Sequence, residues 1–264
     1  MKREIKQFAT EIGVDDVGVC STDDYDSPRS PAIATLFPAA RSIVVLAFGD
    51  LAGCEGLNPY IAMNGRADLG AFSRFCSYRV ARFIEKRLGG KAATTSTFPF
   101  DRRRGAVGEL SLRHAAVAAG LGRFGRHNLV IHPSMGSSVI FAAVLTNLEL
   151  EPDSPVREDL CTDCGVCSTG CPARALEEEG RTDVLKCIGV SQPYGIRSHI
   201  NFWVRFGQSS AEERKRMLTD PEYQLLYQAQ SFGNQYSCFH CIASCPAGRD
   251  GNLRAESLPD LSQP

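Results

Sequence analysis

The densest cysteine motif of the chain has the residue types and spacing of an iron–sulfur site. Of the 11 cysteines, Cys161, Cys164, Cys167 and Cys171 follow the pattern C-x2-C-x2-C-x3-C, and Pro172 completes it. Bacterial ferredoxins use this run: three thiolates on a tight loop bind one [4Fe–4S] cluster, and the fourth binds a second cluster. We expect a helix to open after Cys171, because proline is tolerated at a helix start. The motif therefore predicts two clusters and one-electron transfer.

A second cysteine motif is incomplete and predicts a displaced ligand. Cys238, Cys241 and Cys245 keep the x2 and x3-C-P spacings, but Gln235 stands where the leading cysteine would be. Cys187 is the only other cysteine in this half of the chain, so we expect it to supply the missing thiolate. Eight thiolates then serve two clusters. We predict that one cluster takes Cys161, Cys164, Cys167 and Cys245, and that the other takes Cys171, Cys187, Cys238 and Cys241.

Zinc and disulfides are the alternative explanations of these cysteines. Zinc sites prefer paired C-x2-C knuckles, which would leave the two C-P cysteines without a role. Disulfides are rare in a reducing cytoplasm. The three remaining cysteines fall outside both motifs: we interpret Cys20 and Cys76 as small core residues and Cys54 as a loop residue.

Composition limits the classes of protein that fit. The chain has 264 residues, with 29 Lys and Arg against 30 Asp and Glu. This near-neutral balance argues against a nucleic-acid binder. The first residues show no apolar signal region. No stretch approaches the roughly 18 apolar residues of a membrane span, so we expect a cytoplasmic protein that does not enter a membrane.

The elements that must position these cysteines follow from hydrophobic periodicity. The pattern predicts helices at 5–12, 72–88 and 111–119, and strands at 17–20, 42–48 and 138–148. Proline and acidic residues at 151–155 mark a domain boundary. We therefore predict a mixed α/β (α+β) domain at 1–150 and a ferredoxin-like domain at 151–264, ending in a short polar tail.

Three segments of the first half resemble the epoxyqueuosine reductase family, which is related to reductive dehalogenases. Residues 36–45 (LFPAARSIVV) resemble the family's FP-x-A-[RK]-S-[VI] entry into a strand. Residues 119–128 (AGLGRFGRHN) resemble its AGLGW-[IF]-GKN segment. Residues 136–137 (GS) and 144–150 (VLTNLEL) resemble its GS and LTDLEL segments, and the cysteine motifs follow, including the displaced cysteine. The resemblance covers most of residues 1–250.

This resemblance implies a fold and cofactors that the residues alone do not. It implies a nitroreductase-like α/β domain ahead of the ferredoxin-like domain, with cobalamin held between them. Electrons would pass from a ferredoxin or flavodoxin through the clusters to the cobalamin. The residues placed near the corrinoid by resemblance are Gly122, Gly125, Arg126, Asn128 and Ser137. On their own, the two glycines are equally typical of a turn after a helix.

One departure from the family pattern concerns the proton donor. The family's donor is an aspartate at the position of Ala106, and alanine cannot donate a proton. Glu109 is our candidate for the catalytic acid, provided that burial raises its pKa. The alternative is a solvated glutamate at a helix start, where acids are favoured.

The predicted function is reduction of an unidentified, small substrate by a cobalamin-dependent oxidoreductase. One alternative is an electron carrier, or a reductive activator, whose acceptor is a corrinoid protein. A second alternative is an epoxyqueuosine reductase that acts on tRNA with Glu109 as its acid. Because the charge is near neutral and little chain follows Cys245, we predict that tRNA is an unlikely partner.

Overall fold

The computed structural model describes residues 1–54, 58–95, 108–231, 233 and 237–247. Two positions singled out in the sequence, Ala106 and Gln235, lie outside these residues. In the first half the elements are α1 (Lys2–Glu11), β1 (Asp16–Ser21), α2 (Ile33–Leu36), β2 (Ser42–Gly49), η1 (Ala52–Cys54), α3 (Pro59–Arg87), β3 (Ala92–Thr94), α4 (Leu112–Ala118), β4 (Arg123–Phe124), β5 (Val130–Ile131) and β6 (Val139–Thr146).

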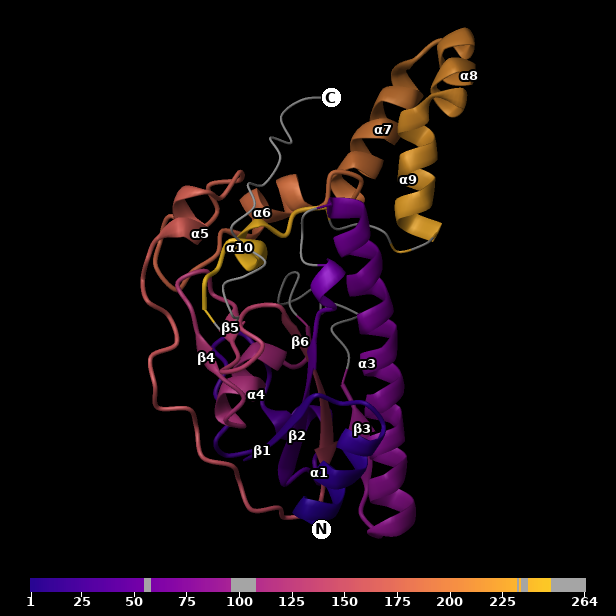
Figure 1. The fold of residues 1–264 in the computed structure, drawn as a ribbon. Helices are drawn as coiled ribbons and strands as arrows, with labels where there is room; N and C mark the ends of the chain where they lie inside the picture. The colour runs from indigo at the N-terminus through magenta and orange to yellow at the C-terminus, as the bar shows by residue number, and fades with distance from the viewer. Residues whose placement is uncertain (55–57, 96–107, 232, 234–236, 248–264) are drawn as a thin grey trace.

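A four-stranded antiparallel sheet forms the centre of the first half. Its strand order is β1-β2-β6-β3, and β2 pairs with β6 along its whole length, from Ser42 opposite Thr146 to Gly49 opposite Val139. Helices α1 and α3 lie against one side of the sheet, and α4 lies against the other (Figure 1). Because both faces are covered, seven consecutive residues of β2 are buried, which explains its uninterrupted apolar sequence.

The hydrophobic core divides into two clusters, one on each face of the sheet. Ile5 of α1 and Val80 and Ile84 of α3 pack on one face. Ala115 and Ala116 of α4 pack on the other face. The prediction that Cys20 and Cys76 are core residues is confirmed, since both are fully buried in these clusters.

The helix predicted at 72–88 begins much earlier in the structure than its apolar pattern indicated. Helix α3 begins at Pro59, where the Asn58 side chain accepts hydrogen bonds from the backbone N–H groups of Tyr60 and Ile61. Proline at the first helical position and asparagine as N-cap are both strong start signals. The apolar periodicity missed this first half because few of its side chains are buried.

The cysteine-bearing half begins with residues 151–165, which contain no helix or strand. The elements that follow are α5 (Val166–Thr169), α6 (Val184–Ser191), α7 (Ile196–Gln208), α8 (Ala211–Thr219), α9 (Pro221–Ser231) and α10 (His240–Ala243). The helix expected after Cys171 is absent, since Pro172 lies in a turn. The boundary at 150 stays a prediction, as do the nitroreductase-like and ferredoxin-like assignments.

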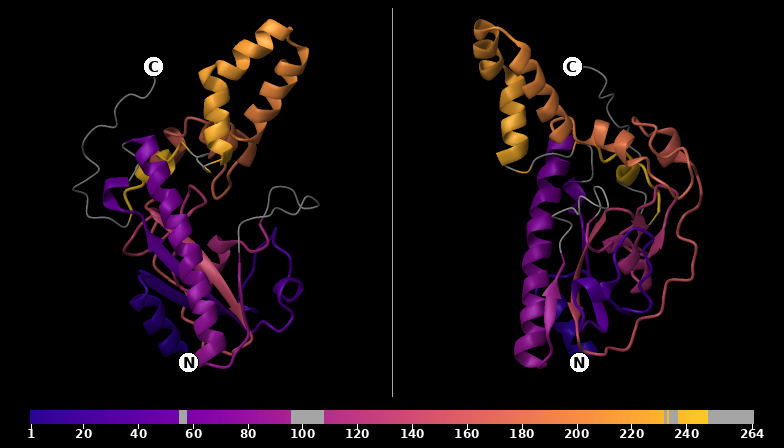
Figure 2. Two further views of the ribbon diagram at one scale, coloured as in Figure 1. Left: turned by 90° about the vertical axis from the view of Figure 1, so that its right-hand side faces the viewer. Right: turned by 180° about the vertical axis from the view of Figure 1, so that it is seen from behind.

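Helices α7, α8 and α9 form an arm that projects away from the rest of the molecule in all views (Figures 1 and 2). Its core is aromatic: the ring of Phe202 stacks on Tyr223 with centroids 5.5 Å apart, and Trp203 meets Phe202 edge to face. Within the described part of the chain, none of the helices combines the length and apolar character that a membrane span requires.

Candidate functional site

The structure gathers four cysteines of the first predicted group. Burial raises the pKa of the Cys167 thiol, and the charges of three further cysteines raise this pKa again; they are Cys245, Cys161 and Cys164. Cys245 follows the arm in the sequence and lies 74 positions after Cys171, the last cysteine of the first motif. The fold nevertheless brings Cys245 close to Cys167. Thiols that raise each other's pKa lie close together and repel once ionised, and a bound cation relieves this repulsion.

The second predicted group is also brought together. Burial raises the pKa of Cys241 to about 12, and the charges of Cys238, Cys187 and Cys171 contribute to this rise, as does Cys167 of the first group. The same neighbours, Cys238 and Cys171, raise the pKa of Cys187. Cys187 on α6 therefore lies near Cys171 and Cys238, and its role as a cluster ligand stays a prediction.

The chemistry of these eight thiols fits iron–sulfur clusters. Among the residues that the structure describes, no three His, Cys, Asp or Glu side chains are arranged to hold a single metal ion. A cluster spreads its ligands over several irons, so its thiolates stand farther apart than those around one zinc ion. The assignment of individual cysteines to clusters stays a prediction.

Backbone N–H groups point at two of the cysteine sulfurs. The Arg126 N–H points at Cys161 Sγ at 3.5 Å, and the Ala175 N–H points at Cys171 Sγ at 3.4 Å. Hydrogen bonds to sulfur are one of the ways in which a protein sets a cluster's reduction potential. His240 packs against Gly170, where a Cβ would come within 2.3 Å of its Nε2 atom. This contact holds the two cysteine loops together.

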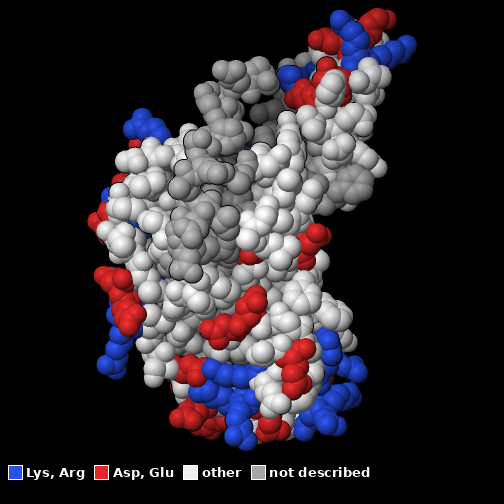
Figure 3. Space-filling model, in the orientation of Figure 1, with Lys and Arg blue, Asp and Glu red and all other residues white. Residues whose placement is uncertain are grey.

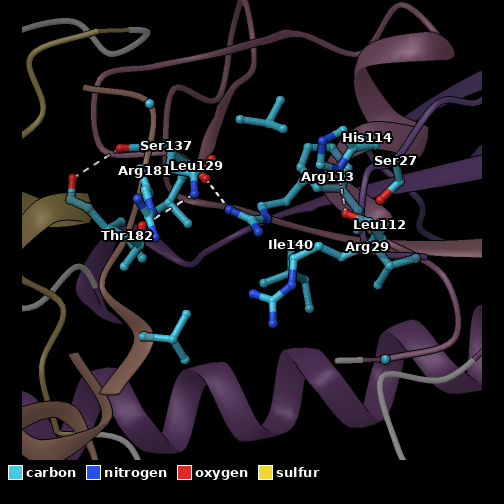
Figure 4. A pocket seen from close by; sticks show the side chains of 18 of the residues that line it. Ser27, Arg29, Leu112, Arg113, His114, Leu129, Ser137, Ile140, Arg181 and Thr182 are labelled. Carbon is cyan, nitrogen blue, oxygen red and sulfur yellow. Dashed lines mark hydrogen bonds between the residues drawn. The ribbon is translucent and has the colours of Figure 1, made fainter. Parts of the chain in front are cut away.

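A cavity of about 1460 Å³ lies between the first half of the chain and the cysteine-bearing half (Figure 4). One part of its wall comes from α3, α4 and β6, and another part comes from residues 174–186 and Ile242. Ser137, itself buried, donates a hydrogen bond from its Oγ to the Ile242 carbonyl at 3.1 Å. Since Ile242 follows Cys241 directly, this bond fixes the cavity wall against the cysteines.

Basic side chains dominate the charge of the cavity. Its lining includes seven basic residues, Arg29, Arg66, Arg74, Arg113, Arg174, Arg181 and Lys186, and three acidic ones, Glu177, Glu178 and Asp183. Four of the basic residues form ion pairs, as Arg181 does with Glu178 at 2.8 Å. Among the described residues, the other three, Arg29, Arg74 and Arg113, have no carboxylate partner. Such a surface favours anionic ligands.

The five residues expected near the corrinoid divide between the cavity and its support. Asn128 and Ser137 line the cavity, whereas Gly122, Gly125 and Arg126 are outside its lining. Arg126 instead pairs with Asp163 at 2.7 Å. Corrinoid contacts of all five stay predictions.

The two glycines have a packing role in the β4–β5 hairpin. A Cβ at Gly122 would lie 2.2 Å from the Ile131 carbonyl oxygen, and one at Gly125 would lie 2.7 Å from Ile131 Cδ1. Gly122 also has a φ of 151°, which other residues rarely adopt. Asn128 lies in the same hairpin with a φ of 58°, its carbonyl accepts from Arg113, and its Nδ2 donates to Thr182 at 3.4 Å.

Glu109, the predicted acid, is outside the cavity lining, although its neighbours Gly108 and Leu110 belong to it. Its catalytic role stays a prediction. The sequence reasoning gave no role to His114, which does line the cavity and whose Nδ1 lies 2.7 Å from Ser111 Oγ. A serine and a histidine three positions apart at the start of a predicted helix lie on the same helix face, and this spacing could have indicated their contact.

Curated proteins similar to this chain include epoxyqueuosine reductases. The enzyme of Staphylococcus aureus is 27% identical, and the alignment covers 100% of this chain and 70% of that protein. The enzyme of Listeria monocytogenes is 30% identical, with 98% of this chain and 68% of that protein covered. The chain thus spans about two thirds of the length of these relatives. No family model matches the chain.

Solved structures of epoxyqueuosine reductases and of a reductive dehalogenase share the fold of this chain. The epoxyqueuosine reductase of Streptococcus thermophilus matches with a TM-score of 0.60 at 20% identity, over 95% of this chain and 66% of that one. An epoxyqueuosine reductase in complex with a modified tRNA stem loop matches with a TM-score of 0.58 at 22% identity, over 98% and 68%. A reductive dehalogenase, described as B12-dependent, matches with a TM-score of 0.56 at 18% identity, over 90% and 37%.

These findings overturn the prediction that tRNA is an unlikely partner. Relatives that align along the whole chain include epoxyqueuosine reductases, and one structural neighbour holds a tRNA stem loop. Total charge misled because opposite charges cancel in the sum, although basic residues outnumber acidic ones along the cavity. On the face shown in Figure 3, both signs are mixed near the N-terminus and around α8.

Proposed function

This chain belongs to the epoxyqueuosine reductase family, and on that premise we propose that it reduces the epoxide of epoxyqueuosine in tRNA. The overall reaction that we propose takes up two electrons and two protons. It breaks the carbon–oxygen bonds of the epoxide, leaves a carbon–carbon double bond and releases the oxygen as water. A low-potential one-electron reductant supplies the electrons.

The cysteine groups support two [4Fe–4S] clusters as resident cofactors. Cys161, Cys164, Cys167 and Cys245 would hold one, and Cys171, Cys187, Cys238 and Cys241 would hold the other. When bound, the clusters supply single electrons, and a cobalamin supplies a metal centre that can act on a carbon–oxygen bond. The chain's own residues fix the sulfurs, shape the cavity and handle the protons.

The observation that carries this proposal is the large basic cavity beside the cysteines. Pockets for small ligands usually measure about 300–1,000 Å³, so a volume of about 1460 Å³ has room for a bulky cofactor together with a nucleoside. Asn128 and Ser137 present polar groups to this space. A plain electron carrier needs no such cavity.

Arginines of the cavity lining support an RNA substrate. Guanidinium groups bind phosphate through paired N–H donors. Arg29 and Arg74 come from opposite parts of the first half, the segment before α2 and helix α3, so together they could hold a phosphate backbone at the cavity. Burial lowers the pKa of Arg113, which is tied to the Asn128 carbonyl instead.

The proposal is tested with the full chain, purified without oxygen and loaded with iron, sulfide and cobalamin. We expect dithionite-reduced protein to convert an epoxyqueuosine-modified tRNA stem loop to the queuosine form, detected by mass spectrometry of the digested RNA. An unmodified stem loop of the same sequence is the control. Retention of the clusters without cobalamin uptake or conversion would contradict the proposal and favour an electron carrier.

A further inference from the structure

We propose that His114 donates a proton to the oxygen of the epoxide, at the end of the cavity away from the cysteines. This inference rests on the proposed function and names a residue that performs one of its steps. It replaces Glu109 as the candidate acid.

The proposed reaction requires an acid at the reacting oxygen. When two electrons enter the epoxide, a carbon–oxygen bond breaks and the bonding pair stays on oxygen. The oxygen then carries a negative charge until it takes a proton, and its departure as water takes a second proton. A side chain that delivers the first proton lowers the barrier by an amount typical of general acid catalysis, about 10²–10⁴-fold in rate.

His114 lies where such an acid would be useful. In Figure 4, His114 and Ser27 lie at one end of the cavity, whereas Ser137, Arg181 and Thr182 lie at the other end. The second end adjoins the cysteines, because Ser137 is bonded to the residue after Cys241. Electrons therefore have a short route into one end of the cavity, and His114 offers a proton from the other.

Local contacts fix the ring of His114 and leave one nitrogen available. The Nδ1 atom lies 2.7 Å from Ser111 Oγ, and the ring packs against Phe124 with centroids 4.9 Å apart. Among the described residues, Nε2 has no hydrogen-bond partner. In the protonated ring both nitrogens carry a hydrogen: Nδ1–H donates to Ser111 Oγ, and Nε2–H is the proton that is given up, which leaves a neutral imidazole.

Ser111 is itself held in place. Its backbone N–H donates to the Tyr25 hydroxyl at 2.9 Å, so the start of α4 is anchored to the segment that follows β1. Ser111 is thus a positioning residue for His114, and it acts through the imidazole and not on the substrate.

The charges that face His114 favour release of its proton. Burial lowers the pKa of His114, the Arg113 cation lowers it further, and Asp26 opposes this shift. Arg113 lines the same cavity, so its positive charge also stabilises negative charge on a nearby oxygen. Arg29 adds a further cation to the lining, and the Tyr25 hydroxyl accepts from the Ser111 N–H.

The experiment compares His114→Gln with Glu109→Gln in the fully loaded protein. Single-turnover conversion of the epoxyqueuosine stem loop is followed after reduction with dithionite. We expect the His114 variant to lose about 10²–10⁴-fold in rate, with unchanged stem-loop Kd, iron content and cobalamin uptake. The Glu109 variant should stay within about twofold of wild type, because its side chain is outside the cavity lining.

Two further readouts separate a proton donor from a structural residue. Because only protonated His114 donates, the wild-type rate should fall as pH rises through the pKa of His114, and this dependence should vanish in His114→Gln. Histidine NMR should show the His114 resonance, assigned by its loss in the variant, titrating below the ordinary range and shifting when Ser111 is replaced by alanine.

Each outcome decides between the two proposals. An active wild type with an equally active His114→Gln variant, or with activity lost in Glu109→Gln instead, would overturn the role of His114 alone. Loss of stem-loop binding or of cofactors in His114→Gln would overturn it as well, since the residue would then be structural. A fully loaded wild type that does not convert the stem loop would overturn the proposed function and this inference with it.

Discussion

At the scale of single residues, Cys187 is the predicted cluster ligand that lies outside both cysteine motifs. It lies on α6, outside either C-x2-C motif, yet its thiol reaches the group that contains Cys171 and Cys238. The Asp183 side chain caps the start of α6 by accepting from the Lys186 N–H at 3.1 Å. This cap fixes the helix that carries the cysteine to its partners.

Replacing Cys187 by serine should therefore remove one cluster. We expect iron to fall from about eight to about four atoms per chain, because a hydroxyl is a poor ligand for this cluster type. Iron analysis and electron paramagnetic resonance of the reduced protein measure the decrease. Cys54→Ser is the matched control, since Cys54 is also a partly buried free cysteine but lies outside both groups. Equal iron contents in the two variants would refute the ligand assignment.

At the scale of elements, the junction between β1 and the end of α4 is a very close backbone contact. Gly18 in the middle of β1 has no room for a side chain. A Cβ there would lie 2.2 Å from the Ala119 carbonyl oxygen and 2.9 Å from Leu121 Cγ. Backbone cannot yield as a flexible side chain does, so strand and helix approach this closely only with glycine.

Gly18→Ala should destabilise the fold by about 1–3 kcal/mol or more, because overpacking forces α4 away from the sheet. Urea denaturation followed by circular dichroism measures the change in the free energy of unfolding. Gly53→Ala provides the comparison, since nothing lies within 4 Å of a Cβ built there; its effect should stay within about 0.5 kcal/mol. Equal stability of the two variants would contradict the close approach of β1 to the end of α4.

At the scale of the whole molecule, the distribution of charge matters more than its sum. The net charge is −1, but Arg29, Arg74 and Arg113 line one cavity without carboxylate partners among the described residues. The arm formed by α7–α9 carries its own mixture of charges around α8, away from the cavity (Figures 1 and 3).

The double variant Arg29→Gln, Arg74→Gln should bind the stem loop more weakly and with less dependence on salt. Removing one arginine–phosphate ion pair reduces the slope of log K against log salt by roughly 0.7–0.9, because fewer counterions are released on binding. Fluorescence anisotropy at several salt concentrations measures both effects. Arg87→Gln, at the opposite end of α3 from the cavity, should change neither. An unchanged slope in the double variant would mean that these arginines do not bind RNA.

The sequence alone predicted the chemistry of the cysteines and indicated the main strands of the sheet. Ligand spacing is a local property of the chain, so the motif at 161–171 and the gap at the second motif were readable without a fold. Strand β2 was equally readable, because burial on both faces leaves a continuous apolar run. By contrast, the start of α3, with few buried side chains, and the two-residue strands β4 and β5 left no periodic signal.

Only the tertiary structure decided what the first half of the chain places beside the cysteines. Arg29, Arg74 and Arg181 are far apart in the sequence and line the same space only because α3 and the cysteine-bearing half enclose one cavity. The same fold gave Gly122 and Gly125 a packing role and brought His114 to the cavity wall. Spacing along the chain encodes ligands on one loop, whereas a cavity depends on distances between segments that no local pattern records.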